Sequence, residues 1–153
     1  NTADEARIVA ESSKFYPLGN RGMFTSRQGI GVEDYTLKAN DETLVVILIE
    51  DIIAVENLDE ILTVENIDVF FVASSDLAQS MWLINGENHP KVVKIIDDSI
   101  SKILDAGKIA GFHVVDSDVE DYVSKGVKFI STSVEQWIEK GAKNFLDRCK
   151  NPV

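Results

Sequence analysis

A chain of 153 residues is long enough to form one globular domain with a substantial hydrophobic core. Its composition, with 44% hydrophobic and 27% charged residues, excludes a disordered chain and a disulfide-stapled miniprotein. The net charge of −11 argues against nucleic acid and anionic membranes as partners, and no apolar run approaches the ~20 residues of a membrane span. The single cysteine, Cys149, cannot form an internal disulfide, which favours the reducing cytoplasm.

The first part of the chain predicts two helices around an irregular segment. Residues 1–15 favour a helix, because Thr2 and Glu5 have the spacing of a capping box and apolar residues follow at helical intervals. The sequence at 16–20 breaks this helix, and a second, short helix is predicted over 32–40.

The clearest pattern is a set of apolar segments, each followed by a helical one. Residues 43–49 form a continuous run rich in β-branched side chains, which is typical of a strand buried on both faces. The other predicted elements are strands at 67–73, 109–115 and 127–132 and helices at 53–62, 88–106, 117–125 and 133–149. Helix ends are marked by Asn88-His89-Pro90, Gly107, Gly126 and Ser133. Alternating strands and helices indicate one α/β domain with a parallel sheet.

Acidic residues follow the first two predicted strands at their carboxyl ends, where parallel α/β sheets bind ligands. Glu50 ends the first strand and Asp76 follows the second, so both should project into one crevice. Two neighbouring carboxylates with few cations nearby are stable when a hard divalent cation such as Mg²⁺ or Mn²⁺ lies between them. The alternative is that they are solvated loop residues or helix caps, and a cap is the expected role of Asp51.

Other polar residues near the strand ends allow two interpretations each. Ser74 and Ser75 lie in a predicted turn whose backbone N–H groups could hold a carboxylate or phosphate, or that could be a plain turn. His113, near the end of the third strand, could be a general base or simply a core or surface histidine. Packing roles are expected for Trp82, Trp137 and Cys149.

Several stretches of the sequence carry a family resemblance. They are Lys14-Phe-Tyr-Pro-Leu-Gly-Asn-Arg-Gly22, Val45-Val-Ile-Leu-Ile-Glu50, Ala54-Val-Glu-Asn-Leu-Asp-Glu-Ile-Leu62, Ile67-Asp-Val-Phe-Phe-Val-Ala-Ser-Ser-Asp-Leu-Ala-Gln-Ser-Met81 and Asn88-His-Pro90. Together they resemble the HpcH/HpaI aldolase (citrate-lyase-like) family. The most specific parts are the Ile-Glu strand end and the Ser-Asp-Leu turn at their mutual spacing.

The resemblance implies a metal-dependent class II pyruvate aldolase on a (β/α)₈ barrel, which cleaves or forms 4-hydroxy-2-oxo acids to give pyruvate and an aldehyde. Glu50 and Asp76 would be the metal ligands, with Mg²⁺ or Mn²⁺ as the cation and Co²⁺ as a third candidate. Backbone amides around Ser74 and Ser75 would hold the pyruvate carboxylate. The metal would stabilise the enolate, so no Schiff-base lysine is needed.

The resemblance also predicts what this chain lacks. The catalytic histidine of the family, its acidic partner and an arginine lie on early strands that would precede Asn1. Residues 1–153 are therefore expected to form a single domain, the carboxyl-terminal half of the barrel (strands 5–8), with no catalytic base and with no activity, or very weak activity, alone. Relatives assemble as hexamers that exchange the last helix, so residues 134–149 are expected to do so in a homo-oligomer. Half a barrel would also leave two sheet edges and one face uncovered.

Departures from the family pattern leave the aldehyde open. Leu48 stands where the family often has glutamine, Ala78 where it has serine, and Trp82 where it has glycine; Ala73-Ser74 replaces Gly-Pro.

Two functions of other classes stay open at this stage. One is a receiver-like, Mg²⁺-binding signalling module, which the acidic pair Glu50-Asp51 fits weakly. In a receiver such a pair ends the first strand, whereas here more than forty residues precede the pair. The other is a non-catalytic interaction domain, which a well-packed dimer without metal binding would favour.

Overall fold

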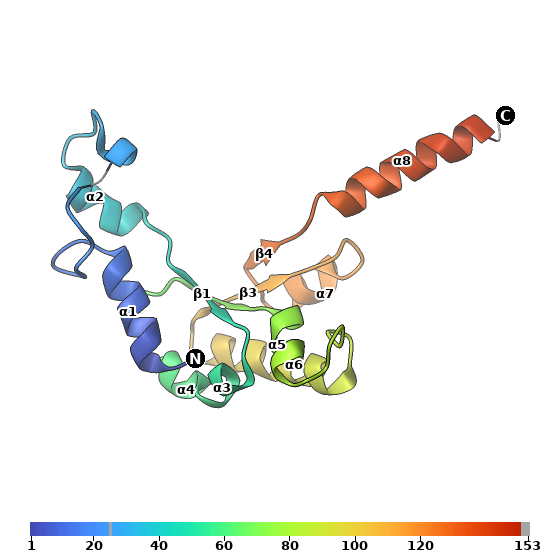
Figure 1. Ribbon diagram of the computed structural model, residues 1–153, viewed down its shortest axis with the longest axis horizontal. Coiled ribbons are helices and arrows are strands. Elements are labelled where there is room, and N and C mark those ends of the chain that lie inside the picture. Colours follow the sequence, from blue (N-terminus) through green and yellow to red (C-terminus); the bar gives the residue numbers. More distant parts are fainter. Residues whose placement is uncertain (25, 151–153) are drawn as a thin grey trace.

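Four parallel strands form the centre of the computed structural model, which describes residues 1–24 and 26–150 (Figure 1). Their order in the sheet follows the sequence: β1 (Val46–Ile49), β2 (Val69–Val72), β3 (Ile109–His113) and β4 (Phe129–Ser131). Sequential order is the arrangement of a barrel segment, whereas a doubly wound sheet changes direction part-way. The predicted fold, a parallel four-stranded α/β portion of a (β/α)₈ barrel, is confirmed, with each strand slightly shorter than expected.

Helices connect the strands along one side of the sheet. The described helices are α1 (Ala3–Ser13), the 3₁₀ turn η1 (Ser26–Gly29), α2 (Tyr35–Glu42), α3 (Ile52–Glu56), α4 (Leu58–Ile61), α5 (Ser74–Ser80), α6 (Pro90–Asp105), α7 (Val119–Ser124) and α8 (Glu135–Lys150). Among them, none combines the length and the apolar character needed to cross a lipid bilayer.

Several local signals in the sequence act as expected. Thr2, Asp51 and His89 each cap a helix (α1, α3 and α6) by accepting a hydrogen bond from a backbone N–H with the side chain. Gly107 and Gly126 follow α6 and α7 with φ angles of +71° and +97°, a conformation that favours glycine. These residues fix where the connecting helices begin and end.

Three helix boundaries differ from the prediction. The second helix begins at Tyr35, because Asp34 has a left-handed backbone (φ 55°) that cannot belong to a right-handed helix. The helix predicted over 53–62 is divided into α3 and α4 at Asn57, whose backbone (φ −92°, ψ 8°) leaves the helical region. The last helix begins at Glu135 and not directly after Ser133.

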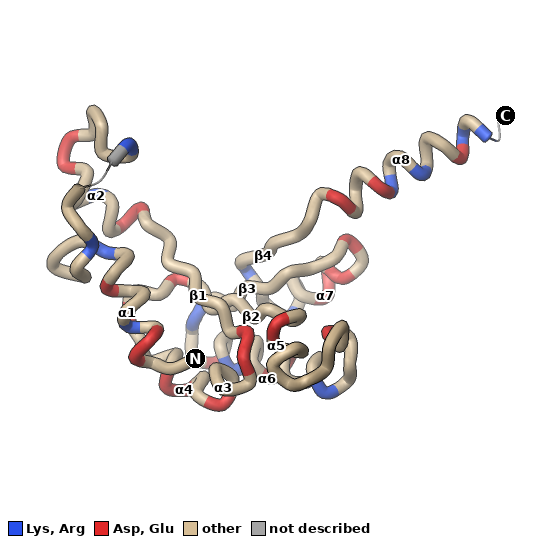
Figure 2. The backbone as a smooth tube through the Cα atoms, viewed as in Figure 1, with Lys and Arg blue, Asp and Glu red and all other residues tan. Residues whose placement is uncertain are grey.

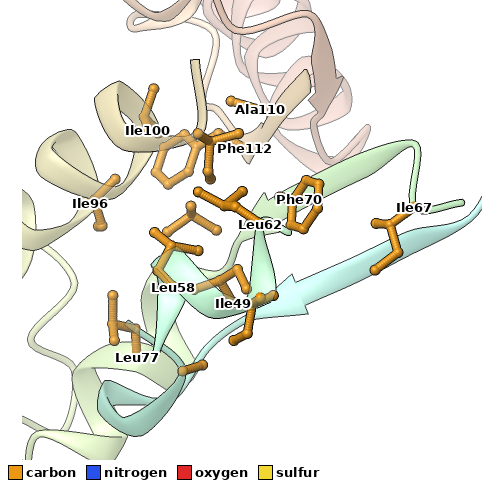
Figure 3. Close-up of a cluster of buried hydrophobic side chains, with 14 of the residues drawn as sticks. Ile49, Leu58, Leu62, Ile67, Phe70, Leu77, Ile96, Ile100, Ala110 and Phe112 are labelled. Atoms are coloured by element: carbon orange, nitrogen blue, oxygen red, sulfur yellow. The ribbon is translucent and has the colours of Figure 1, made fainter. Parts of the chain in front are cut away.

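One face of the sheet is buried beneath the helices and forms the core (Figure 3). Phe70 and Ala110 occupy the middle of the two central strands and are fully buried. Their neighbours in the core include Ile49, Leu58, Leu62, Leu77, Ile96, Ile100 and Phe112. The helix residues come from α3 to α6, so these connections hold the strands in place through one continuous apolar cluster.

The opposite face of the sheet is open. Leu48, Phe71, Gly111 and Phe129 are aligned across the four strands in one row. Leu48 is 53% exposed, and the rings of Phe71 and Phe129 meet edge to face with centroids 6.1 Å apart. A Cβ on Gly111 would lie 2.7 Å from the ring of Phe71, so only glycine allows this ring contact. The row gives the open face an apolar floor.

Helix α8 extends away from the sheet, toward the upper right of Figure 1, and none of its residues is buried. Its first two turns are held by Asp116, which accepts hydrogen bonds from Trp137 Nε1 (3.2 Å) and Lys140 Nζ (3.0 Å). The bonds from Lys140 and Trp137 hold the pKa of the Asp116 carboxyl below its usual value. The expected burial of Cys149 is wrong, because this helix leaves the core and the thiol is exposed.

Candidate functional site

A cavity of about 470 Å³ opens at the carboxyl end of β1, beside α5. Its walls are formed by Asn1, Glu50, Asp51, Asp76, Gln79, Ser80 and Trp82. Glu50 and Asp76 thus lie in one crevice, as their places after neighbouring strands predict. Figure 2 shows the acidic segments that follow β1 and begin α5 as neighbouring red stretches of the chain.

The ends of β1 and β2 position the two carboxylates. Ile49 faces the core, so the next residue, Glu50, belongs to the open face of the sheet. The backbone N–H of Ala73 donates to the carbonyl of Ile49 (3.1 Å), which extends the strand pairing to the point where Glu50 begins. Asp76 stands three residues further along, in the first turn of α5.

Ser80 joins the segments that carry the two carboxylates. Its Oγ accepts a hydrogen bond from the backbone N–H of Ile52 (3.0 Å) and donates to the carbonyl of Leu77 (2.7 Å). The start of α3, just after Glu50, is therefore fastened to the end of α5. Ser80 could not be predicted from the sequence, because a serine on a short helix gives no signal of a long-range contact.

The two carboxylates carry no internal counter-charge. In the part of the chain that the structure describes, neither Glu50 nor Asp76 has a side-chain hydrogen bond or an ion pair. The described residues also form no cluster of three or more His, Cys, Asp or Glu side chains suited to a metal ion. A pair of carboxylates alone fits a hard cation such as Mg²⁺, which keeps several coordination positions for water and substrate oxygens.

The segment predicted as a turn before Asp76 is instead the first turn of α5. Ser74 is half-buried and Ser75 is exposed, and neither is among the residues that line the cavity. The correction follows from the hydrogen bond of Leu77 N–H to the carbonyl of Ala73 (3.2 Å), which closes a helical turn. The first backbone N–H groups of a helix have no partner within it, so donors are still available here.

Trp82 is exposed at the rim of the cavity, so the packing role expected for it is wrong. It follows the end of α5 with φ 62°. Its N–H donates to the carbonyl of Gln79 and the N–H of Leu83 donates to that of Ala78, the two bonds of a Schellman motif. Glycine is the usual residue at this left-handed position, which accounts for the glycine of the family pattern.

Replacing Trp82 with glycine should stabilise the chain by about 1 kcal/mol, because it removes the strain of a left-handed non-glycine residue. Little burial is lost, since the side chain is 92% exposed. Urea denaturation measures the change. Trp82→Ala is the matched control: it removes the same indole but keeps the strained Cβ. Equal stability of the glycine and alanine variants would show that the backbone strain is unimportant.

His113 is exposed at the end of β3, and its Nδ1 lies 3.1 Å from Ser131 Oγ. It is therefore a surface histidine and not a core one. Trp137 is half exposed, and its indole N–H is bound to Asp116.

The profile of the HpcH/HpaI aldolase/citrate lyase family matches residues 1–137. The chain belongs to this family. Such a match over most of the chain confirms the resemblance carried by the strand-end acids and their spacing.

The curated relatives of this HpcH/HpaI chain include enzymes named as aldolases. A 2-keto-3-deoxy-L-rhamnonate aldolase of Klebsiella pneumoniae is 38% identical over 97% of this chain and 56% of the relative. An enzyme of the same name from Shigella sonnei is 36% identical over 93% of this chain and 55% of the relative. The chain thus spans about half the length of the curated relatives it matches.

Solved structures of the family share the fold. A HpcH/HpaI aldolase/citrate lyase family protein from Burkholderia cenocepacia superposes with a TM-score of 0.84 at 22% identity, over 98% of this chain and 62% of that one. The HpcH/HpaI aldolase from Desulfitobacterium hafniense gives 0.77 at 25% identity, over 94% and 60%.

Proposed function

We propose that this chain supplies the metal-binding half of a class II aldolase that cleaves or forms 4-hydroxy-2-oxo acids by way of a pyruvate enolate. The observation that carries the proposal is the placement of two unpartnered carboxylates, Glu50 and Asp76, in one cavity at the carboxyl end of a parallel sheet. Membership of a family with aldolase relatives supports it. In this proposal residues 1–153 are one domain, equivalent to strands 5–8 of the barrel.

The residues of the chain have distinct tasks in this mechanism. Glu50 and Asp76 hold a divalent cation, Mg²⁺, Mn²⁺ or Co²⁺. That cation supplies Lewis-acid stabilisation of the negative charge that develops on a 2-oxo acid. Backbone N–H groups at Ser74 and Ser75 bind the carboxylate of the substrate. Ser80 is a positioning residue, because it fixes the segment after Glu50 relative to α5.

A Schiff-base mechanism is less consistent with the site. The described residues that line the cavity include no lysine. Lys14, the buried lysine among the described residues, donates hydrogen bonds from Nζ to the carbonyls of Asn40 and Thr43 and lies outside this cavity. An ammonium group held in this way has no role as a nucleophile, which favours the metal-dependent mechanism.

Titration with Mn²⁺ tests the proposal directly. We expect saturable binding that a water-proton relaxation measurement detects, and a loss of affinity of about 100-fold or more in Glu50→Gln and in Asp76→Asn, because each removes one charged ligand. Asp51→Asn is the matched control, since it removes a charge from the same cavity while asparagine still caps α3. Unchanged affinity in either ligand variant would refute the assignment.

Two further measurements separate the other two functions. Formation of an aspartyl phosphate with a small phosphodonor would favour the receiver-like module. A stable native dimer that binds no Mn²⁺ would favour the interaction domain.

We further propose that the chain by itself turns over slowly or not at all, because no described residue of the site is assigned as the proton-transfer group. General acid–base catalysis typically contributes ~10²–10⁴-fold, which is the size of the expected deficit.

The exposed apolar residues of α8, which include Trp137, Ile138 and Phe145, suit docking on a second copy in a cytoplasmic homo-oligomer.

A further inference from the structure

A second polar group lies on the open face of the sheet, away from the two carboxylates. His113 and Ser131 are register partners at the ends of β3 and β4, and their side chains meet with Nδ1 and Oγ 3.1 Å apart. Among the described residues, the imidazole Nε2 has no hydrogen-bond partner. The proposed metal site does not use this pair.

The pair stands level with the proposed metal ligand. The register of the strands places Glu50, Ala73, His113 and Ser131 in one row across the carboxyl end of the sheet. Neighbouring strands are ~4.8 Å apart, so Glu50 and His113 are separated by two spacings, on the order of 10 Å. Between them stands Ala73, whose side chain is a single methyl group.

The row below this one is apolar. It consists of Leu48, Phe71, Gly111 and Phe129 on the same face of the sheet. A molecule bound along the upper row would therefore meet carboxylates at one end, a hydrophobic floor in the middle, and an imidazole and a hydroxyl at the other end. With a divalent cation held by the two carboxylates, such a site would complement a short organic acid that carries a hydroxyl group.

We propose that His113 and Ser131 form the specificity site for the hydroxyl-bearing end of a 2-oxo acid whose acid end lies at the cation site of Glu50 and Asp76 and the backbone N–H groups of Ser74 and Ser75. This inference rests on the proposed function. Three C–C bonds of ~1.5 Å each carry the 4-hydroxyl roughly 4–5 Å from the acid end, toward His113. Ser131 engages Nδ1 and orients the ring, so that Nε2 is left to bind the hydroxyl.

The chemistry of the pair selects hydroxylated acids over unsubstituted ones. A hydroxyl group donates and accepts, so it can pair with Nε2 in either tautomer of the ring. A hydrocarbon end would desolvate Nε2 without giving it a partner, which costs free energy.

The inference is tested by comparing how this protein, with Mg²⁺ present, binds two acids that differ by one hydroxyl group. The probes are 2-oxobutanoate and 4-hydroxy-2-oxobutanoate. We expect the wild type to prefer the hydroxylated acid about 3- to 10-fold, the range of one hydrogen bond. The ring resonances of His113 should shift with the hydroxylated acid only.

His113→Leu and Ser131→Ala should abolish this preference, while both variants still bind both acids. His89→Asn is the matched control, because it replaces a histidine at the start of α6 with another capping residue. A preference that survives in both site variants would overturn the role of the pair while leaving the metal site intact. Failure of 2-oxobutanoate to bind the wild type would overturn the metal site and this inference together.

Discussion

Truncation of Phe70 to alanine is expected to lower the free energy of unfolding by about 3–5 kcal/mol, the usual cost of emptying a fully buried phenylalanine site. The side chain has no exposed surface and belongs to the buried cluster of Figure 3. It stands in the middle of β2, between its register partners Ile47 and Ala110. Helices pack over this side chain, so the surrounding residues have little freedom to fill the space that the truncation leaves. Urea denaturation of the variant and the wild type measures the change.

Phe71→Ala is the matched control, because it removes the same side chain from the next residue of the same strand. Phe71 belongs to the open face and is only half-buried, so a loss of about 1 kcal/mol is expected, mainly from its edge contact with Phe129. Equal losses at the two positions would mean that the open face is covered in solution, by self-association or by further chain. Because Phe70 faces away from Glu50, its folded variant should bind Mn²⁺ as the wild type does.

The sheet and the two acids could be predicted because each depends on a short-range pattern. The runs at 43–49 and 67–73 are apolar along their length, which predicts strands. The burial on both faces expected for the first run is not found, because the open face of the sheet leaves Leu48 53% exposed. The place of Glu50 directly after such a run then determines the end of the sheet on which it lies. The cap at Asp51 is equally local, since it involves a backbone N–H two residues away.

The features that could not be predicted depend on contacts between distant residues or on strain. Ser80 accepts a hydrogen bond from the backbone N–H of Ile52, 28 positions away in the chain, and no local pattern marks such a pair. Trp82 occupies a glycine position, so the usual preference of tryptophan for the core gave the wrong environment. Cys149 is exposed because α8 leaves the sheet, and the direction of a terminal helix is not encoded in its own periodicity.

Replacing Lys14 with methionine is expected to lower the free energy of unfolding by about 2–4 kcal/mol, because two backbone carbonyls would lose their partner at ~1–2 kcal/mol each. Lys14 is only 5% exposed, and its Nζ lies 2.7 Å from the carbonyl oxygens of both Asn40 and Thr43. The Asn40 side chain in turn pairs with both backbone groups of Phe15. These bonds fasten the end of α1 to the segment that leads into β1.

Lys38→Met is the matched control, because Lys38 is exposed and donates to a single carbonyl, that of Glu33. Its loss should change stability by less than about 0.5 kcal/mol. A small effect at Lys14 would mean that water replaces its bonds to the two carbonyls. Reduction with borohydride in the presence of pyruvate gives a separate test of its chemistry. If Lys14 is structural, this treatment leaves it unmodified, whereas a trapped adduct on Lys14 would contradict the metal-dependent mechanism and replace it with a Schiff base.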